Sequence, residues 1–157
     1  MHELDPNEYN KLGVCFRPES AAIIGASTNP MKFGGRALKF CLERGYGGRL
    51  YPINANNNVV QGVKAFGHID DLPEAPDIAV IAVPAPSVRE NLIAAGEKGC
   101  KVAVVYGAQF AEAGGDGRAR QDELLSIARS HNMRMIGPNC MGVISLSSGF
   151  VASFTAA

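Results

Sequence analysis

Short apolar runs alternate with amphipathic stretches along the chain. The runs lie at residues 21–24, 49–53, 77–83, 101–106 and 134–136, and each is followed by glycine, proline or asparagine. Continuous apolar runs of this length are typical of parallel strands that are covered on both faces. Residues 36–44, 87–98 and 118–131 carry apolar positions at helical spacing. The alternation predicts an α/β fold with a Rossmann-like, doubly wound parallel sheet of about five to six strands and helices on both faces.

The same pattern predicts finer features. The expected strand order is 3-2-1-4-5, with residues 59–66 as a short edge piece. Ser87 and Glu90 are spaced as a capping box, and Gly45 is placed to end the first helix. We divide the chain into a leader (1–19), a Rossmann-like domain (20–146) and a tail (147–157), and the tail shows no clear element.

Composition narrows the class of protein. The chain has 157 residues, 46% of them hydrophobic, and its 15 basic and 15 acidic residues give no net charge. Because no basic stripe is visible, we expect no nucleic-acid partner. No apolar run approaches the length of a membrane helix, so we expect no membrane span. Four widely spaced cysteines without a CxxC pair argue against a zinc site and favour the cytoplasm. The low charged fraction, 19%, is compatible with a homo-oligomer.

The loops that follow the predicted strands are the candidate site, because open α/β sheets bind ligands beyond the carboxyl ends of their strands. These loops begin at Gly25, Asn54, Pro84, Gly107 and Gly137. The first loop has small residues that let backbone N–H groups approach a phosphate, and a helix N-terminus follows it. Its Ser27 and Thr28 hydroxyls and the Lys32 charge strengthen the prediction of a phosphate site.

A dinucleotide is one candidate ligand. Its fingerprint requires G-x-G-x-x-G in the first loop and an acid about 20 residues later. Ser27 occupies the second glycine position, and Asn54 follows the second strand without an acid nearby. An amide can still bond a ribose hydroxyl, so an NAD-binding domain stays open as an alternative.

Four motifs in this order and spacing carry a family resemblance. They are Gly25-Ala26-Ser27, Tyr51-Pro52-Ile53-Asn54, Ala82-Val83-Pro84-Ala85 and Ile136-Gly137-Pro138-Asn139-Cys140-Met141-Gly142. Together they resemble the N-terminal CoA-binding domain of the ADP-forming (NDP-forming) acyl-CoA synthetases, a family related to the succinyl-CoA synthetase alpha subunit. The resemblance covers about residues 16–148.

The resemblance implies a role for each loop. Residues 25–28 would hold a phosphate of coenzyme A, residues 83–85 would lie against pantetheine or adenine, residues 107–109 would line the groove, and Asn139 would lie near the thiol. Lys32 and Asn54 are added because their polar side chains follow the first and second strands. The predicted site is therefore Gly25, Ala26, Ser27, Thr28, Lys32, Asn54, Val83, Pro84, Ala85, Gly107, Ala108, Gln109 and Asn139.

One departure from the family concerns a lysine that relatives often carry after the second strand to meet a phosphate. Residues 54–58 are Asn-Ala-Asn-Asn-Asn and contain no cation. Lys32, Arg49 and Lys64 are the candidate replacements.

The resemblance also implies a larger acid–thiol ligase that uses ATP or ADP with magnesium in an ATP-grasp domain and a phosphohistidine in another domain. We therefore expect a missing domain after the tail. We expect neither catalytic nor metal-ligating residues in this chain. The chain alone should then bind coenzyme A without turning it over. His2, His68 and His131 lie outside any phosphohistidine-like motif. A stand-alone regulatory CoA-binding module and the first domain of an acetyltransferase fusion remain alternatives.

Overall fold

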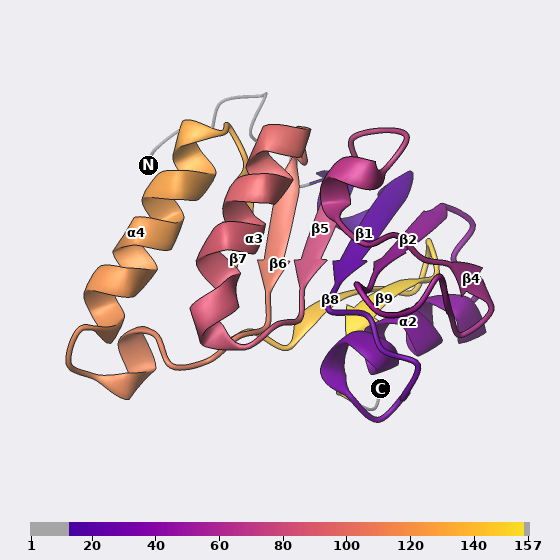
Figure 1. Ribbon diagram of the computed structural model, residues 1–157, viewed down its shortest axis with the longest axis horizontal. Coiled ribbons are helices and arrows are strands. Elements are labelled where there is room, and N and C mark those ends of the chain that lie inside the picture. Colours follow the sequence, from indigo (N-terminus) through magenta and orange to yellow (C-terminus); the bar gives the residue numbers. More distant parts are fainter. Residues whose placement is uncertain (1–12, 156–157) are drawn as a thin grey trace.

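The computed structural model describes residues 13–155 and is built around one five-stranded parallel sheet (Figure 1). The strands are β1 (Ser20–Ile24), β2 (Arg49–Ile53), β5 (Ile78–Ile81), β6 (Val102–Val105) and β7 (Arg134–Ile136). The helices are α2 (Phe33–Glu43), α3 (Ala85–Lys98) and α4 (Gly117–Ser130), with short 3₁₀ turns η1 (Ile69–Asp71) and η2 (Ala111–Ala113). The predicted α/β class and doubly wound architecture are confirmed. Most of the leader, residues 1–12, lies outside the described residues, and residues 13–16 are helical.

The predicted strand order is wrong at one edge. The sheet has the order β2-β1-β5-β6-β7, which is 2-1-3-4-5 when its strands are counted along the chain. Residues 59–66 turn back at Gln61 and Gly62 and form an antiparallel hairpin of β3 (Val59–Val60) and β4 (Val63–Lys64). The hairpin meets the main sheet through the single bridge between Ile53 and Phe66, so β2 remains the edge strand.

Alternate residues of the central strands supply two separate cores. Along β6, Val102 and Val104 face the core under α2, whereas Ala103 and Val105 face the core under α3 and α4. Both cores are fully buried, which is why these strands read as continuous apolar runs rather than as alternating ones.

The tail contains a strand that the sequence did not predict. β9 (Phe150–Ser153) pairs antiparallel with β8 (Gly142–Ser145), and every residue of β9 is buried. Phe150 packs on Tyr46 with ring centroids 5.2 Å apart. This hairpin covers the α2 face of the sheet, and residue 146 lies between its two strands.

Two predicted helix starts differ from the structure, and one predicted helix end is confirmed. α3 begins at Ala85, with Pro84 as its N-cap residue and no side-chain cap, so the predicted Ser87 capping box is wrong. Proline presets the backbone for the first helical turn without a capping side chain. α2 begins at Phe33 and not after Gly35, which makes Lys32 its N-cap residue. Gly45 is confirmed as the terminating residue of α2, with φ of +68°.

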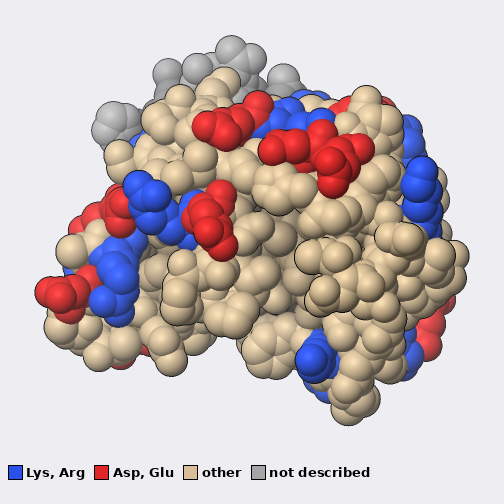
Figure 2. Space-filling model, viewed as in Figure 1, with Lys and Arg blue, Asp and Glu red and all other residues tan. Residues whose placement is uncertain are grey.

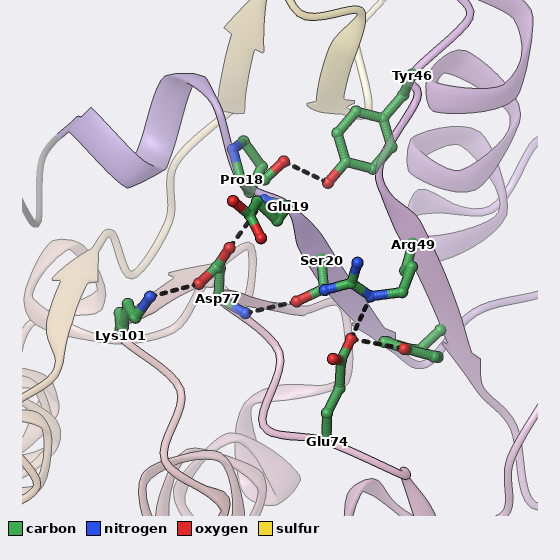
Figure 3. A network of polar contacts seen from close by, with 9 residues as sticks. Pro18, Glu19, Ser20, Tyr46, Arg49, Glu74, Asp77 and Lys101 are labelled. Atoms are coloured by element: carbon green, nitrogen blue, oxygen red, sulfur yellow. Dashed lines mark hydrogen bonds and ion pairs between the residues drawn. The ribbon is translucent and has the colours of Figure 1, made fainter.

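A polar network joins the amino ends of the strands, at the edge opposite the predicted site (Figure 3). The Asp77 carboxylate accepts hydrogen bonds from the Glu19 N–H (2.8 Å) and the Lys101 ammonium (2.7 Å). Asp77 N–H donates to the Ser20 hydroxyl (3.1 Å). Glu74 accepts from the Arg49 guanidinium (2.5 Å) and the Tyr51 hydroxyl (2.6 Å). The network fixes the strand starts.

Within the described range, 13–155, the helices are too short or too polar to cross a membrane.

Candidate functional site

A cleft of about 1030 Å³ opens at the carboxyl edge of the sheet. Figure 2 shows that the lower edge of the molecule, where the strands of Figure 1 end, is hollowed and has few charged side chains around it. Every predicted site residue except Thr28 lines this cleft, namely Gly25, Ala26, Ser27, Lys32, Asn54, Val83, Pro84, Ala85, Gly107, Ala108, Gln109 and Asn139. Thr28 is exposed and is not among the lining residues.

Seven further lining residues were missed. They are Met31, Phe33, Gly34, Ala82, Pro86, Tyr106 and Phe154. Most adjoin predicted positions and could have been found by extending each loop by one or two residues. Phe154 had no such signal, because it follows the unpredicted strand β9. Its ring stacks on Phe33 at 4.4 Å and meets Tyr106 edge-on at 5.0 Å, which gives the cleft an aromatic wall.

Glycines bring α2 directly onto the first loop. Gly25 has φ of +83°, and a Cβ there would lie 2.5 Å from the Ala82 carbonyl oxygen. A Cβ on Gly34 would collide with the Gly25 carbonyl oxygen. Only residues without a side chain permit this approach, so the first turn of α2 borders the cleft.

The N-terminus of α2 makes this end of the cleft electropositive. The N–H groups of its first turn precede the first intrahelical bond, from Arg36 N–H to the Lys32 carbonyl (2.7 Å), and have no acceptor within the helix. No acidic side chain lies in that turn. Lys32 is the only charged residue among the described residues that line the cleft. A helix N-terminus with a lysine favours an anionic ligand.

Asn54 uses its whole amide to hold two loops together. Its Nδ2 donates to the Ala26 carbonyl (2.8 Å), and its Oδ1 accepts from the N–H groups of Asn56 (2.9 Å) and Asn57 (3.0 Å). A carboxylate could not donate the first of these bonds. Asn54 therefore shapes the first loop, which explains in physical terms why an amide occupies the position where an NAD-binding fold carries an acid.

Gln61 is a second amide clamp, and sequence reasoning did not find it. Its Nε2 donates to the carbonyls of Ser27 (2.9 Å) and Gly35 (2.8 Å), so the β3–β4 hairpin holds the first loop against α2. The Ser27 hydroxyl accepts from the Asn29 N–H (3.1 Å).

The three candidate cations lie in different places. Lys32 lines the cleft. Arg49 is engaged with Glu74 at the amino end of β2, and the Lys64 ammonium lies 5.1 Å from the Phe66 ring centroid. Neither Arg49 nor Lys64 is among the cleft-lining residues, so Lys32 is the one of the three candidates that lines the cleft.

Residues 107–109 and Asn139 form another wall of the cleft, and hydrogen bonds hold it in place. Asn139 N–H donates to the Gly107 carbonyl (2.9 Å). Gln109, with φ of +76°, donates its N–H to a Glu112 carboxylate oxygen (2.6 Å), which Phe110 N–H also approaches at 3.2 Å. The N–H of Glu112 itself and these two N–H groups lower the pKa of that carboxyl. The wall is thus preformed.

The Cys140 thiol is not activated, and the described residues hold no cluster of metal ligands. Burial raises the pKa of the Cys140 thiol, which donates to the Val105 carbonyl (3.4 Å), so this thiol is packed rather than activated. No group of three or more potential metal ligands occurs among residues 13–155. The geometry suits binding and positioning of an anionic ligand.

Comparison with known proteins decides the family. A model of the CoA-binding domain family matches residues 19–145. The chain belongs to the CoA-binding domain family. Coenzyme A is the cofactor of this domain.

Relatives of this CoA-binding domain are larger proteins. It is 41% identical over 139 residues to the ADP-forming acetate–CoA ligase II subunit alpha of Pyrococcus furiosus, covering 88% of the chain and 30% of the relative. It is 37% identical over 139 residues to ADP-forming acetate–CoA ligase II of Archaeoglobus fulgidus, covering 88% and 21%. A solved dinucleotide-forming acetyl-coenzyme A synthetase 1 of Ca. Korarchaeum cryptofilum, in complex with phosphate and ADP, superposes with a TM-score of 0.88 at 34% identity, covering 92% and 31%. The chain thus spans about a third or less of the length of these relatives.

Proposed function

We propose that this chain supplies the coenzyme A site of an ADP-forming acyl-CoA synthetase. The observation that carries the proposal is the match of nearly the whole chain to ADP-forming ligases. It is joined by a cleft in which, among the described residues, the one charged lining residue is a lysine at a helix N-terminus. NAD-binding and stand-alone regulatory roles are not favoured, because the relatives named above are ligases or synthetases.

The division of the cleft follows from its charge and polarity. The first turn of α2, Lys32 and the Ser27 region hold phosphates of coenzyme A. The apolar wall of Val83, Pro84 and Ala85 receives the less polar parts of the cofactor. Asn139, on the far loop, lies toward the thiol. This assignment keeps all the negative charge of the ligand at the electropositive end of the cleft.

Other parts of the synthetase supply the chemistry. Acyl phosphate formation, the phosphohistidine and the ATP-grasp site with its magnesium belong to other domains or to a partner subunit, and the whole enzyme works in the cytoplasm. The role of this chain is to bind coenzyme A and to orient its thiol, which lowers the entropic cost of the thiol attack.

An assay of the whole enzyme tests the proposal. The protein that carries this chain, with any partner subunit, should convert a carboxylic acid, coenzyme A and ATP to acyl-CoA, ADP and phosphate. A panel of short and aromatic acids covers the unknown acyl group. Formation of AMP and pyrophosphate, or no acyl-CoA from any acid, would contradict the proposal.

A further inference from the structure

Gln61 occupies a turn position that its residue type seldom fills. Val60 pairs with Val63 in the β3–β4 hairpin, so Gln61 and Gly62 form a two-residue turn. Both have positive φ, +49° at Gln61 and +81° at Gly62. Such a turn prefers asparagine, aspartate or glycine at its first position, because other side chains are strained in the left-handed region. The exception is explained if the Gln61 side chain has a task outside the turn.

The Gln61 side chain joins the two segments that form the electropositive end of the cleft. Its Nε2 donates to the Ser27 carbonyl of the first loop (2.9 Å) and to the Gly35 carbonyl in the first turn of α2 (2.8 Å). These segments are in close contact, because a Cβ on Gly35 would collide with the Asn29 carbonyl oxygen. Gln61 itself is not among the cleft-lining residues, so it can act on a ligand only through the segments that it holds.

The bond to Ser27 also fixes the direction of a peptide in the first loop. The C=O and N–H of a trans peptide point in opposite directions, so the Thr28 N–H is turned away from Gln61. The preceding peptide is held in the same way, because Asn54 bonds the Ala26 carbonyl (2.8 Å). Among residues 13–155, neither the Ser27 N–H nor the Thr28 N–H has a hydrogen-bond acceptor. Successive N–H groups that are left unused by the fold are what an anion-binding loop offers.

We propose that Gln61 is a positioning residue, which holds the first loop against α2 in the arrangement that binds the phosphates of coenzyme A. This inference rests on the proposed coenzyme A site and extends it to the β3–β4 hairpin. N–H groups that are already fixed bind an anion without a further loss of conformational entropy. Loss of the clamp should therefore appear as weaker binding of the phosphate-bearing half of the ligand.

Two substitutions separate the amide group from its reach. Gln61→Met keeps the length of the side chain and removes the donor. Gln61→Asn keeps an amide in a residue that the turn favours, but its shorter side chain cannot reach both carbonyls, so the hairpin still forms. Each variant should bind coenzyme A about 3- to 10-fold more weakly. Adenosine 3′,5′-bisphosphate, the nucleotide half without pantetheine, should lose affinity by the same factor.

A substitution in the same hairpin provides the matched control. Val59 lies in β3, is 57% exposed and is not among the residues that line the cleft. Val59→Thr should leave the affinity for both ligands unchanged. Hydrogen exchange of the unliganded proteins adds a readout of position, since residues 26–29 should exchange faster in both Gln61 variants and at the wild-type rate in Val59→Thr.

Calorimetric titration of the four proteins, together with hydrogen exchange, decides the matter. Wild-type affinity in Gln61→Asn or Gln61→Met would show that Gln61 is only a turn residue and would overturn the inference. Weaker binding of coenzyme A with unchanged binding of the bisphosphate would also overturn it, because the effect would then lie in the pantetheine half. Unchanged exchange at residues 26–29 would reject the clamp as the cause. Failure of the wild-type protein to bind coenzyme A is a distinguishable result, which would overturn the proposed function and this inference with it.

Discussion

Ser27 occupies the position where a dinucleotide-binding loop carries its second glycine, and its hydroxyl accepts a hydrogen bond from Asn29 N–H (3.1 Å). An aspartate can accept the same bond, so Ser27→Asp adds a negative charge while keeping the turn. If phosphates of coenzyme A lie here, the substitution should cost about 1–3 kcal/mol of binding free energy. Isothermal titration calorimetry measures the change.

Ser27→Asn is the control for that experiment, because asparagine also accepts the turn bond but carries no charge. Its affinity for coenzyme A should stay close to that of the wild type. Equal affinity of the aspartate and asparagine variants would place the phosphates elsewhere.

Asn54 gives a second test at the level of one atom. Asn54→Asp keeps the acceptor for Asn56 and Asn57 but replaces the donor to the Ala26 carbonyl with a carboxylate oxygen. The repulsion should lower the free energy of unfolding by about 1–3 kcal/mol and should not create NAD binding, although it restores the acid of the dinucleotide fingerprint. Chemical denaturation and an NAD titration check both parts. Tight NAD binding by the variant would refute this explanation of Asn54.

At the scale of elements, the β8–β9 hairpin completes the cleft. The Arg36 guanidinium donates to the Phe154 carbonyl (2.7 Å), and the Phe154 ring stacks on Phe33. The first turn of α2 and the end of β9 are thus joined by two contacts, and ligand binding at α2 should also stabilise the hairpin.

Phe154→Ala tests this coupling. Loss of a partly buried ring should cost about 1–3 kcal/mol of stability and should also weaken coenzyme A binding several-fold, because the aromatic wall is removed. Leu146→Ala, in a residue just after β8 that is 71% exposed, should change neither quantity appreciably. Hydrogen exchange should show that coenzyme A protects residues 150–154, and unchanged exchange there would contradict the coupling.

The elements that the sequence predicted are those whose own residues determine them. The central strands are continuous apolar runs, and Gly45 ends α2 through a local left-handed turn. β9 could not be predicted because Phe150–Ser153 becomes a strand only through pairing with β8 and burial under α2. The α3 start was misplaced because Pro84 and Pro86 set its first turn without a capping side chain.

The residues of the candidate site also fall into those that the local sequence predicted and those that it did not. Loop composition and the family resemblance located the lining residues that follow the strands. Phe154 and the Gln61 clamp depend on contacts between segments far apart in the sequence, which no local pattern encodes. Thr28, although adjacent to lining residues, is exposed outside the cleft because the loop turns at Ser27 and Asn29.

At the scale of the whole molecule, the carboxyl ends and the amino ends of the parallel strands serve different purposes, ligand binding and stability. The carboxyl edge forms the cleft, and the amino edge carries the network around Asp77 (Figure 3). Burial raises the pKa of the Asp77 carboxyl, but the Lys101 ammonium and the N–H groups of Glu19 and Ser20 outweigh this effect and leave the pKa below its ordinary value.

The direction of that shift predicts how stability depends on pH. A depressed pKa stabilises the fold at pH values above the ordinary carboxyl pKa, and this contribution is lost as the pH falls through the folded-state pKa. Asp77→Asn should therefore lower the free energy of unfolding by about 1–2 kcal/mol at pH 7 and flatten the loss of stability in acid. Asp122→Asn, in an exposed pair with Arg118, should have little effect. Denaturation curves between pH 3 and pH 7 distinguish these outcomes, and an unchanged acid profile for Asp77→Asn would reject the role of the network.

Calorimetric titration of the wild-type chain with coenzyme A and with NAD is the most direct test of the central claim. The cleft with its helix N-terminus, Lys32 and amide-held first loop predicts saturable binding of coenzyme A at a stoichiometry of about one, weakened by salt because the phosphates contribute charge. NAD should give no saturable heat under the same conditions. Clear NAD binding with no response to millimolar coenzyme A would contradict the account.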